Sequence, residues 1–170
     1  GTSSCASWVF HGRWVIAPAP PAHAAGTIAV NTIVDEAGAG PNCSLREAVQ
    51  AANNNANFGG CTLSGTQPFT INLGAGTFQL TIVGANENLN ATGDLDIRAS
   101  GTVIAGAGSA STTIQQTTAD RVIEINPTVA ASFSASISNL RITGGNTSSS
   151  IGGGGILAGD SNCLLYTSPS

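Results

Sequence analysis

Short runs of β-branched residues, separated by glycine-rich corners, are the feature that most constrains the fold of this chain. Seven such runs follow residue 66, among them FTINL from Phe69, GTVIAG from Gly101 and RVIEIN from Arg121. Short strands at such spacing predict either an antiparallel sandwich or a stacked solenoid. The dipeptides Asn-Gly and Asp-Gly, which mark two-residue hairpins, are absent, and the corners use Gly-Ala, Ser-Gly and Thr-Gly instead. The pattern therefore favours a parallel solenoid.

Four isoleucines near strand ends indicate the length of one coil. The sequence numbers of Ile82, Ile104, Ile125 and Ile142 differ by 22, 21 and 17 in turn. Intervals near twenty predict coils that each add one rung to a stack, with inward ladders of apolar side chains. The open ends of such a stack would need covering segments.

Composition excludes two classes of partner. The 170 residues have a net charge of −4 and only five cations, all arginines, so no basic patch is available for a nucleic acid. No apolar run approaches the roughly 18 residues of a membrane span, and we predict that this segment does not cross a membrane. Hydrophobic residues make up 41%, which is enough for one packed body.

The string CSLREAVQAAN, residues 43–53, is the clearest helix signal. Ser44 and Glu47 form an S-x-x-E capping box, in which each side chain bonds the backbone N–H of the other residue. The asparagine-rich stretch before Gly59 and Gly60 ends the pattern, so we predict a helix over 44–54. One narrow apolar stripe lies on it, made of Leu45, Ala48, Val49 and Ala52. A helix this short must cover something apolar, and the predicted role is a cap on the first coil.

The cysteines point to an oxidising compartment. Cys43 and Cys61 form a local pair with no histidine nearby, and their spacing fits neither a CxxC redox motif nor a zinc site. A disulfide is the economical interpretation, and two buried free thiols are the alternative.

The sequence predicts four segments. Residues 1–25 are a leader, either the end of a secretory signal with Ala22-His23-Ala24 as an A-x-A site, or a disordered Pro/Ala stretch. Residues 26–66 form the N-terminal cap and residues 67–162 the coils. The string CLLYTSPS at 163–170 resembles translated sequencing-adapter read-through, and we expect these residues to be non-native.

The residues CSLREA resemble the motif after which a group of bacterial envelope and secreted proteins is named. The upstream TIAVNTIVDE, the second cysteine Cys61 and the later VIAGAGSASTTIQ and NLRITGG are similar to the order of phrases in that group, over about residues 27–156. The resemblance implies a right-handed parallel β-helix of the pectate-lyase-like type, exported or attached to the bacterial surface, and it implies no reaction. The predicted fold class is therefore all-β: an incomplete right-handed parallel β-helix with a short N-terminal capping α-helix.

Three residues in one predicted strand are candidates for catalysis. Asp94 and Asp96 are two positions apart on one face of a predicted strand, and Arg98 continues that face. A lyase that bound Ca²⁺ through Asp and used Arg as base would need such neighbours. We favour the plainer interpretation that these side chains face water, and we assign no catalytic residue, no metal ligand and no cofactor, with Ca²⁺ retained only for the lyase. Both histidines, His11 and His23, lie in the leader.

Three arginines have a spacing that would allow stacking. The sequence numbers of Arg98, Arg121 and Arg141 differ by 23 and then by 20, which would place them on successive coils beside Asp120 and Glu124. Isolated surface ion pairs are the alternative.

The expected function is a non-catalytic extracellular or cell-surface scaffold, similar to an adhesin, that contacts extended glycans or surface proteins. The alternative is a polysaccharide lyase or glycosidase. A glycosidase needs two carboxylates that face one groove, and the sequence indicates no convergent cluster of this kind.

Overall fold

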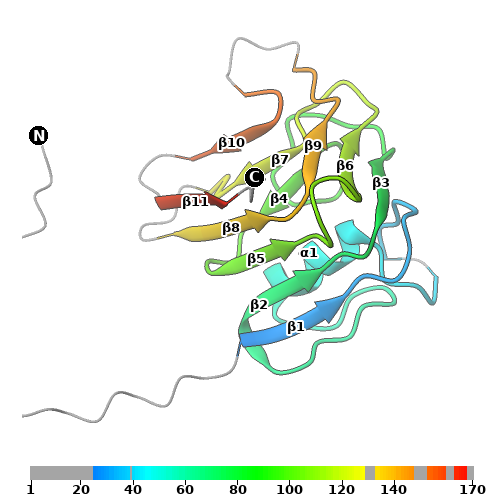
Figure 1. The fold of residues 1–170 in the computed structure, drawn as a ribbon, viewed down its shortest axis with the longest axis vertical. Coiled ribbons are helices and arrows are strands. Elements are labelled where there is room, and N and C mark those ends of the chain that lie inside the picture. Colours follow the sequence, from blue (N-terminus) through cyan, green and yellow to red (C-terminus); the bar gives the residue numbers. More distant parts are fainter. Residues whose placement is uncertain (1–24, 39, 129–132, 148–152, 160–162, 168–170) are drawn as a thin grey trace, which may run out of the picture.

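The computed structural model describes residues 25–38, 40–128, 133–147, 153–159 and 163–167. The predicted leader lies outside the described residues, except for Ala25, and so do residues 168–170 of the predicted non-native tail. The described chain forms one helix and eleven strands (Figure 1). These are β1 (Ala25–Ala29), α1 (Leu45–Asn54), β2 (Thr66–Asn72), β3 (Gly76–Leu80), β4 (Leu95–Ile97), β5 (Thr102–Ala105), β6 (Thr112–Gln116), β7 (Ile123–Ile125), β8 (Ser134–Ser138), β9 (Arg141–Thr143), β10 (Ile156–Ala158) and β11 (Cys163–Thr167).

The strands pair into three separate sheets. The largest has the order β1-β2-β5-β8-β11, and two three-stranded sheets have the orders β10-β7-β4 and β3-β6-β9. Every strand pair within these sheets is parallel. Because parallel neighbours need a long connection, most strands pair with one that comes several elements later in the chain.

Apolar ladders hold the sheets in register. In the largest sheet Ile71 lies opposite Ile104, which lies opposite Ile137, and all three are buried. Their numbers differ by 33 at each step. In the β3-β6-β9 sheet the matching ladder is Phe78, Ile114 and Ile142, with steps of 36 and 28.

The predicted fold class is wrong. The described chain is not an all-β right-handed parallel β-helix with coils of about twenty residues, but three small parallel sheets and one α-helix. Of the four isoleucines, Ile82 lies outside the strands and the other three belong to β5, β7 and β9, which are in three different sheets. The intervals near twenty residues therefore separate isoleucines that occupy different sheets, not the same position in successive coils. Inward-facing isoleucines occur in every sheet, and a one-dimensional count cannot separate them.

Helix α1 is part of the core. Its N-cap Ser44 accepts a hydrogen bond from the Glu47 backbone N–H, and the Glu47 side chain accepts one from the Ser44 N–H, so both halves of the capping box are present. Asn55 ends the helix in the left-handed region at φ 50°. Seven of the helix residues are buried, where α1 packs against β1, β2 and β4. The apolar stripe alone does not account for this, because Arg46 and Glu47 are buried too.

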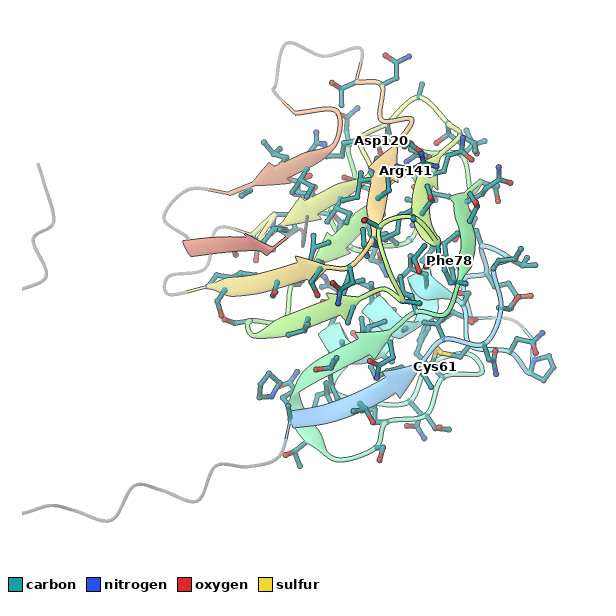
Figure 2. The ribbon with its side chains drawn as sticks, viewed as in Figure 1. Cys61, Phe78, Asp120 and Arg141 are labelled. Atoms are coloured by element: carbon teal, nitrogen blue, oxygen red, sulfur yellow. A yellow bond between two sulfur atoms is a disulfide. The ribbon has the colours of Figure 1, made fainter. Side chains whose placement is uncertain are left out.

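Cys43 and Cys61 form a disulfide that joins the residue before the N-cap to the loop after the helix (Figure 2). Both cysteines are buried. The covalent link closes a loop that contains the whole of α1 and so limits how far the helix can move from the sheets.

No helix in the described ranges is long and apolar enough to span a membrane.

Candidate functional site

A group of acidic side chains gathers where β4 meets β7. The two strands pair in parallel with Leu95 opposite Ile123 and Asp96 opposite Glu124. Because side chains alternate along a strand, Leu95 and Ile123 enter the core while Asp96 and Glu124 share the other face. Asp94 immediately precedes β4, and carboxylate oxygens of Asp94, Asp96 and Glu124 all lie within 4.8 Å of one another. We call these three residues the carboxylate cluster.

The loop before β4 covers this face. The Asn90 backbone N–H donates to Asp96 Oδ2 at 2.7 Å, and the Asp96 backbone N–H donates to Asn90 Oδ1 at 3.2 Å. Asn90 takes a positive φ of 64°, which asparagine tolerates better than most residues. Its side-chain amide also donates to the Arg46 carbonyl at 2.9 Å, which joins the loop to the helix. As a result Asp96 is 0% exposed and Asp94 only 2%.

Helix α1 holds the backbone of the same strand through two side chains. Arg46 donates from its guanidinium to the carbonyls of Gly93, at 2.7 Å, and Asp94, at 2.8 Å. About two turns further along the helix, Asn53 donates to the Asp96 carbonyl at 2.7 Å and accepts from the Arg98 N–H at 2.8 Å. Both ends of β4 are therefore fixed to α1.

Asp35 balances the charge of Arg46. The Arg46 Nε lies 2.8 Å from Asp35 Oδ1, and both side chains are 1% exposed. Asp35 Oδ2 also accepts from the backbone N–H groups of Thr81 and Ile82. The pair of Arg46 and Asp35 thus joins the helix, the segment after β1 and the segment that leads into the carboxylate cluster.

Arg121 forms ion pairs with two members of the cluster. Its guanidinium donates to Glu124 Oε2, and its Nε lies 3.6 Å from Asp94 Oδ2. Asp120 lies beside it and accepts from the Arg121 N–H through Oδ1 and from the Asp94 N–H through Oδ2. Two of the three cluster carboxylates therefore face one guanidinium.

Burial changes the protonation of the cluster. Burial, together with the charges of Asp96 and Asp120, raises the pKa of Asp94 from 3.8 to about 8, against the opposing charge of Arg121. Burial also raises the pKa of Asp96 to about 7, although the Asn90 N–H lowers it. The pKa of Glu124 is raised by burial as well.

Two oxygens of the cluster have no hydrogen-bond partner among the described residues. These are Asp94 Oδ2, which has only the 3.6 Å ion pair with Arg121 Nε, and Asp96 Oδ1, and both are shielded from solvent. Buried polar atoms are nearly always satisfied, and each one left unpaired costs on the order of 1–3 kcal/mol. Carboxylate oxygens are also the preferred ligands of hard divalent cations such as Ca²⁺. The arrangement can therefore hold protons or a cation.

The structure brings only part of the predicted candidate set together. Asp94 and Asp96 are neighbours, but the expectation that they face water is wrong, because the Asn90 loop and α1 cover them. Arg98 is half-buried and its Nε has no hydrogen-bond partner. Arg141, which Figure 2 labels, lies in β9 of another sheet and is exposed. The three arginines therefore do not form one stack. Glu124 was not a catalytic candidate, and only the pairing of β4 with β7 reveals it.

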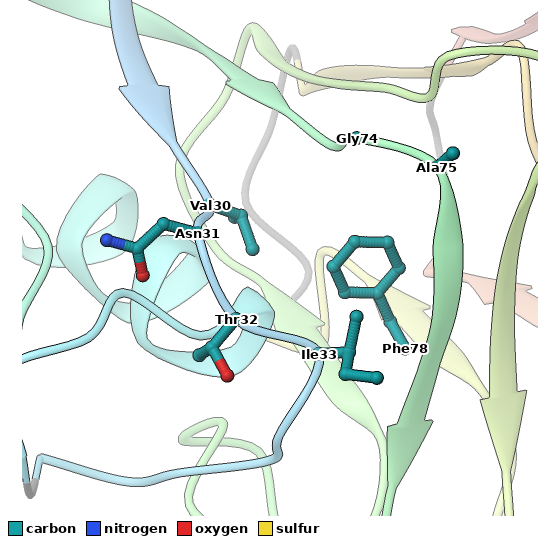
Figure 3. Close-up of a pocket in the computed structure, with 7 residues that line it drawn as sticks. All are labelled: Val30, Asn31, Thr32, Ile33, Gly74, Ala75 and Phe78. Atoms are coloured by element: carbon teal, nitrogen blue, oxygen red, sulfur yellow. The ribbon is translucent and has the colours of Figure 1, made fainter.

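Two hollows on the surface are small and lack acidic residues. One, of about 150 Å³, lies between the segment after β1 and the start of β3 (Figure 3). Its lining residues are Val30, Asn31, Thr32, Ile33, Gly74, Ala75 and Phe78. The other, of about 270 Å³, lies beside α1 and includes Arg46, Gln50 and Leu89. Both fall below the roughly 300–1,000 Å³ of typical small-molecule sites.

Comparison with known proteins finds no matching family model, no matching curated protein and no matching solved structure.

Proposed function

We propose that this chain serves as a non-catalytic scaffold outside the cell or on its surface, in the manner of an adhesin. The observation that supports this most directly is the burial of its acidic candidates: with Asp94 2% and Asp96 0% exposed, neither can touch a polymer chain. Glycoside hydrolysis needs two carboxylates that flank the scissile bond. Enclosed carboxylates suit a structural role better than a catalytic one.

The disulfide and the buried network support a location outside the cytosol. A disulfide persists in oxidising compartments, and Cys43–Cys61 closes the helical segment. The ion pair of Arg46 with Asp35 and its hydrogen bonds to Gly93 and Asp94 fix that segment to a strand far along the chain. Segments tied in this way open rarely, which resists proteolysis.

A polar surface on the β3-β6-β9 sheet supports contact with glycans. Thr77 pairs with Thr113, which pairs with Arg141, and Gln79 pairs with Gln115, whose side chain accepts a hydrogen bond from Gln79 at 3.0 Å. Thr77, Gln79 and Arg141 are exposed and Gln115 is half-buried, while Thr113 lies buried between Thr77 and Arg141. Rows of amides and hydroxyls at the spacing of adjacent strands, about 4.8 Å, offer repeated hydrogen bonds to an extended polymer.

One observation favours the alternative of a polysaccharide lyase or glycosidase. Raised pKa values, such as those of Asp94 and Asp96, are often found at catalytic sites. Burial explains both shifts without a reaction, and we therefore keep the scaffold as the proposal.

The deciding experiment is incubation of the full chain with pectin and polygalacturonate, with and without Ca²⁺. The proposal predicts no release of reducing or unsaturated ends. Release that disappears in Asp96→Ala, while Glu36→Gln retains it, would establish the enzyme and overturn the scaffold. Glu36 suits the control because it is a half-buried carboxylate outside the cluster.

Binding is tested separately on the polar surface. We expect polygalacturonate retention on an affinity gel to fall in Gln115→Ala and Arg141→Ala and to stay unchanged in Ser136→Ala, which alters β8 in another sheet. Equal retention of the unaltered chain and the three variants would rule out glycan contact at this surface.

A further inference from the structure

The carboxylate cluster holds more negative charge than its surroundings neutralise. Asp94, Asp96 and Glu124 come together at β4 and β7, and Asp120 and Glu87 act on them from neighbouring segments. Arg121 and Arg98 are the cations that oppose this charge. Five carboxylates against two guanidiniums leave an excess of three negative charges when all groups are ionised. Charge buried at this density is unstable unless protons or a cation compensate it.

One oxygen of Asp96 shows where a cation would be held. Asp96 uses Oδ2 for the Asn90 N–H and leaves the buried Oδ1 without a hydrogen-bond partner among the described residues. Asp94 Oδ2 accepts no hydrogen bond either and has only a 3.6 Å ion pair with Arg121 Nε. Both residues are almost fully buried, at 0% and 2% exposure, so water does not satisfy these atoms. One carboxylate oxygen from each of the three residues lies within 4.8 Å of the other two, so one cation can contact all three. Ca²⁺ accepts irregular sets of carboxylate oxygens, whereas Mg²⁺ requires a near-ideal octahedron and keeps several waters, so an enclosed cluster suits Ca²⁺ better.

An ion can approach the cluster from solvent on the side of Glu124. Asp94 and Asp96 are closed off, but the Glu124 side chain is 14% exposed. Glu124 thus lies between solvent and the two enclosed aspartates. A cation that entered past Glu124 would reach Asp96 Oδ1 and Asp94 Oδ2 behind it. Arg121 contacts both Glu124 Oε2 and Asp94 Oδ2, so its guanidinium would have to move away from these oxygens or share them with the ion.

We propose that Asp94, Asp96 and Glu124 form a binding site for one divalent cation, with Ca²⁺ as the preferred ion. The ion is structural: it joins β4 to β7 and stabilises the loop that carries Asn90. Carboxylate oxygens of the three residues supply the first ligands, and water that enters on the side of the partly exposed Glu124 completes the six to eight positions that Ca²⁺ requires. The proposal does not depend on the scaffold function, since an enzyme could also hold such an ion.

The test uses the full chain stripped with a chelator, then titrated with CaCl₂ at neutral pH by isothermal calorimetry. We expect one saturable site per chain, weaker binding of MgCl₂, and a rise in the thermal midpoint on addition of CaCl₂. Glu124→Gln and Asp96→Asn should each weaken binding at least about tenfold, the effect of losing roughly 1.4 kcal/mol. Glu36→Gln should bind as the unaltered chain does.

Two results would overturn the site. The first is a folded protein that shows neither heat nor a change in midpoint at about 10 mM CaCl₂, ten times the weakest constants usual for extracellular calcium modules. The second is unchanged affinity in Glu124→Gln, a variant that keeps the enclosed aspartates and so should still fold. Proton uptake on folding at neutral pH, with no Ca²⁺ effect, would show that protons neutralise the cluster instead.

Discussion

The Arg46 guanidinium in helix α1 donates a 2.8 Å hydrogen bond to the carbonyl of Asp94, which lies in a distant part of the sequence. This bond and the one to Gly93 join the helical segment to the strand that carries the carboxylate cluster. Because the same guanidinium pairs with the buried Asp35, its loss would affect three segments at once.

Replacing Arg46 should therefore be among the most destabilising changes in the chain. In Arg46→Met the Asp35 carboxylate stays buried without its ion pair, and we expect a loss of about 3–5 kcal/mol in the free energy of unfolding. Urea unfolding followed by circular dichroism measures it. Arg141→Met, at an exposed position of β9, should change stability by less than about 0.5 kcal/mol. A comparable small loss for both variants would contradict the role assigned to Arg46.

The disulfide gives a second prediction, which mass spectrometry can check directly. The five arginines are the cations of the chain, so trypsin cleaves after Arg13, Arg46 and Arg98 and leaves Cys43 and Cys61 in separate peptides, 14–46 and 47–98. Without reduction these peptides should appear as one linked mass, and reduction should release both. Detection of the two free peptides before reduction would disprove the bond.

Removing the disulfide should also cost stability. The link closes a loop over a sequence separation of 18, for which loop-closure entropy predicts a loss of about 3 kcal/mol in Cys43→Ala/Cys61→Ala. Chemical unfolding of the oxidised chain and of the double variant gives the difference. Addition of reductant should lower the stability of the unaltered chain and leave the double variant unchanged.

The N-cap of α1 should respond more strongly than an ordinary cap. Ser44→Ala removes the acceptor for the Glu47 N–H and also the hydroxyl that donates to the Glu36 carbonyl at 3.0 Å. We expect a loss near the upper end of the usual range, about 2 kcal/mol. Ser134→Ala, at the exposed start of β8, should have little effect in the same urea titration. A loss for Ser44→Ala below about 0.5 kcal/mol, the lower end of that range, would show that the cap contributes little.

The pH dependence of stability should have an unusual sign when no cation is present. The folded-state pKa values of Asp94, about 8, and Asp96, about 7, lie above their unfolded value of 3.8. The folded chain then binds more protons than the unfolded chain, so stability should fall as the pH rises from about 4 to about 8. Urea midpoints measured in chelator at several pH values follow this decline. Asp96→Asn should flatten the decline and Glu36→Gln should keep it, whereas a midpoint that rises over this range would contradict the shifts.

Local signals accounted for much of the secondary structure. Ser44 and Glu47 placed the start of α1 within the sequence because capping is a contact between residues three apart. The runs from Phe69, Gly101 and Arg121 overlap β2, β5 and β7 for a similar reason, since alternation along a strand is local. The pairing of strands is not local, and the interval of the isoleucines led to the wrong equivalences.

The carboxylate cluster shows why the site was harder to predict than the elements. The sequence shows Asp94 and Asp96 two apart, but their burial depends on Asn90, which bonds Asp96, and on Arg46 and Asn53 in α1. Glu124 joins them only because β7 pairs with β4. None of these partners is marked by composition or spacing, and the buried role of Arg46 runs against the usual exposure of arginine.

The unequal steps of the apolar ladders have a consequence for how this chain could change over evolution. The numbers of adjacent rungs differ by 33 along Ile71, Ile104 and Ile137, but by 36 and then by 28 along Phe78, Ile114 and Ile142. The corners between strands thus absorb these differences in length while the paired side chains stay opposite one another. Insertions and deletions in these corners should be tolerated. A descendant of this chain could therefore acquire new surface loops while the apolar side chains of the ladders stay in place.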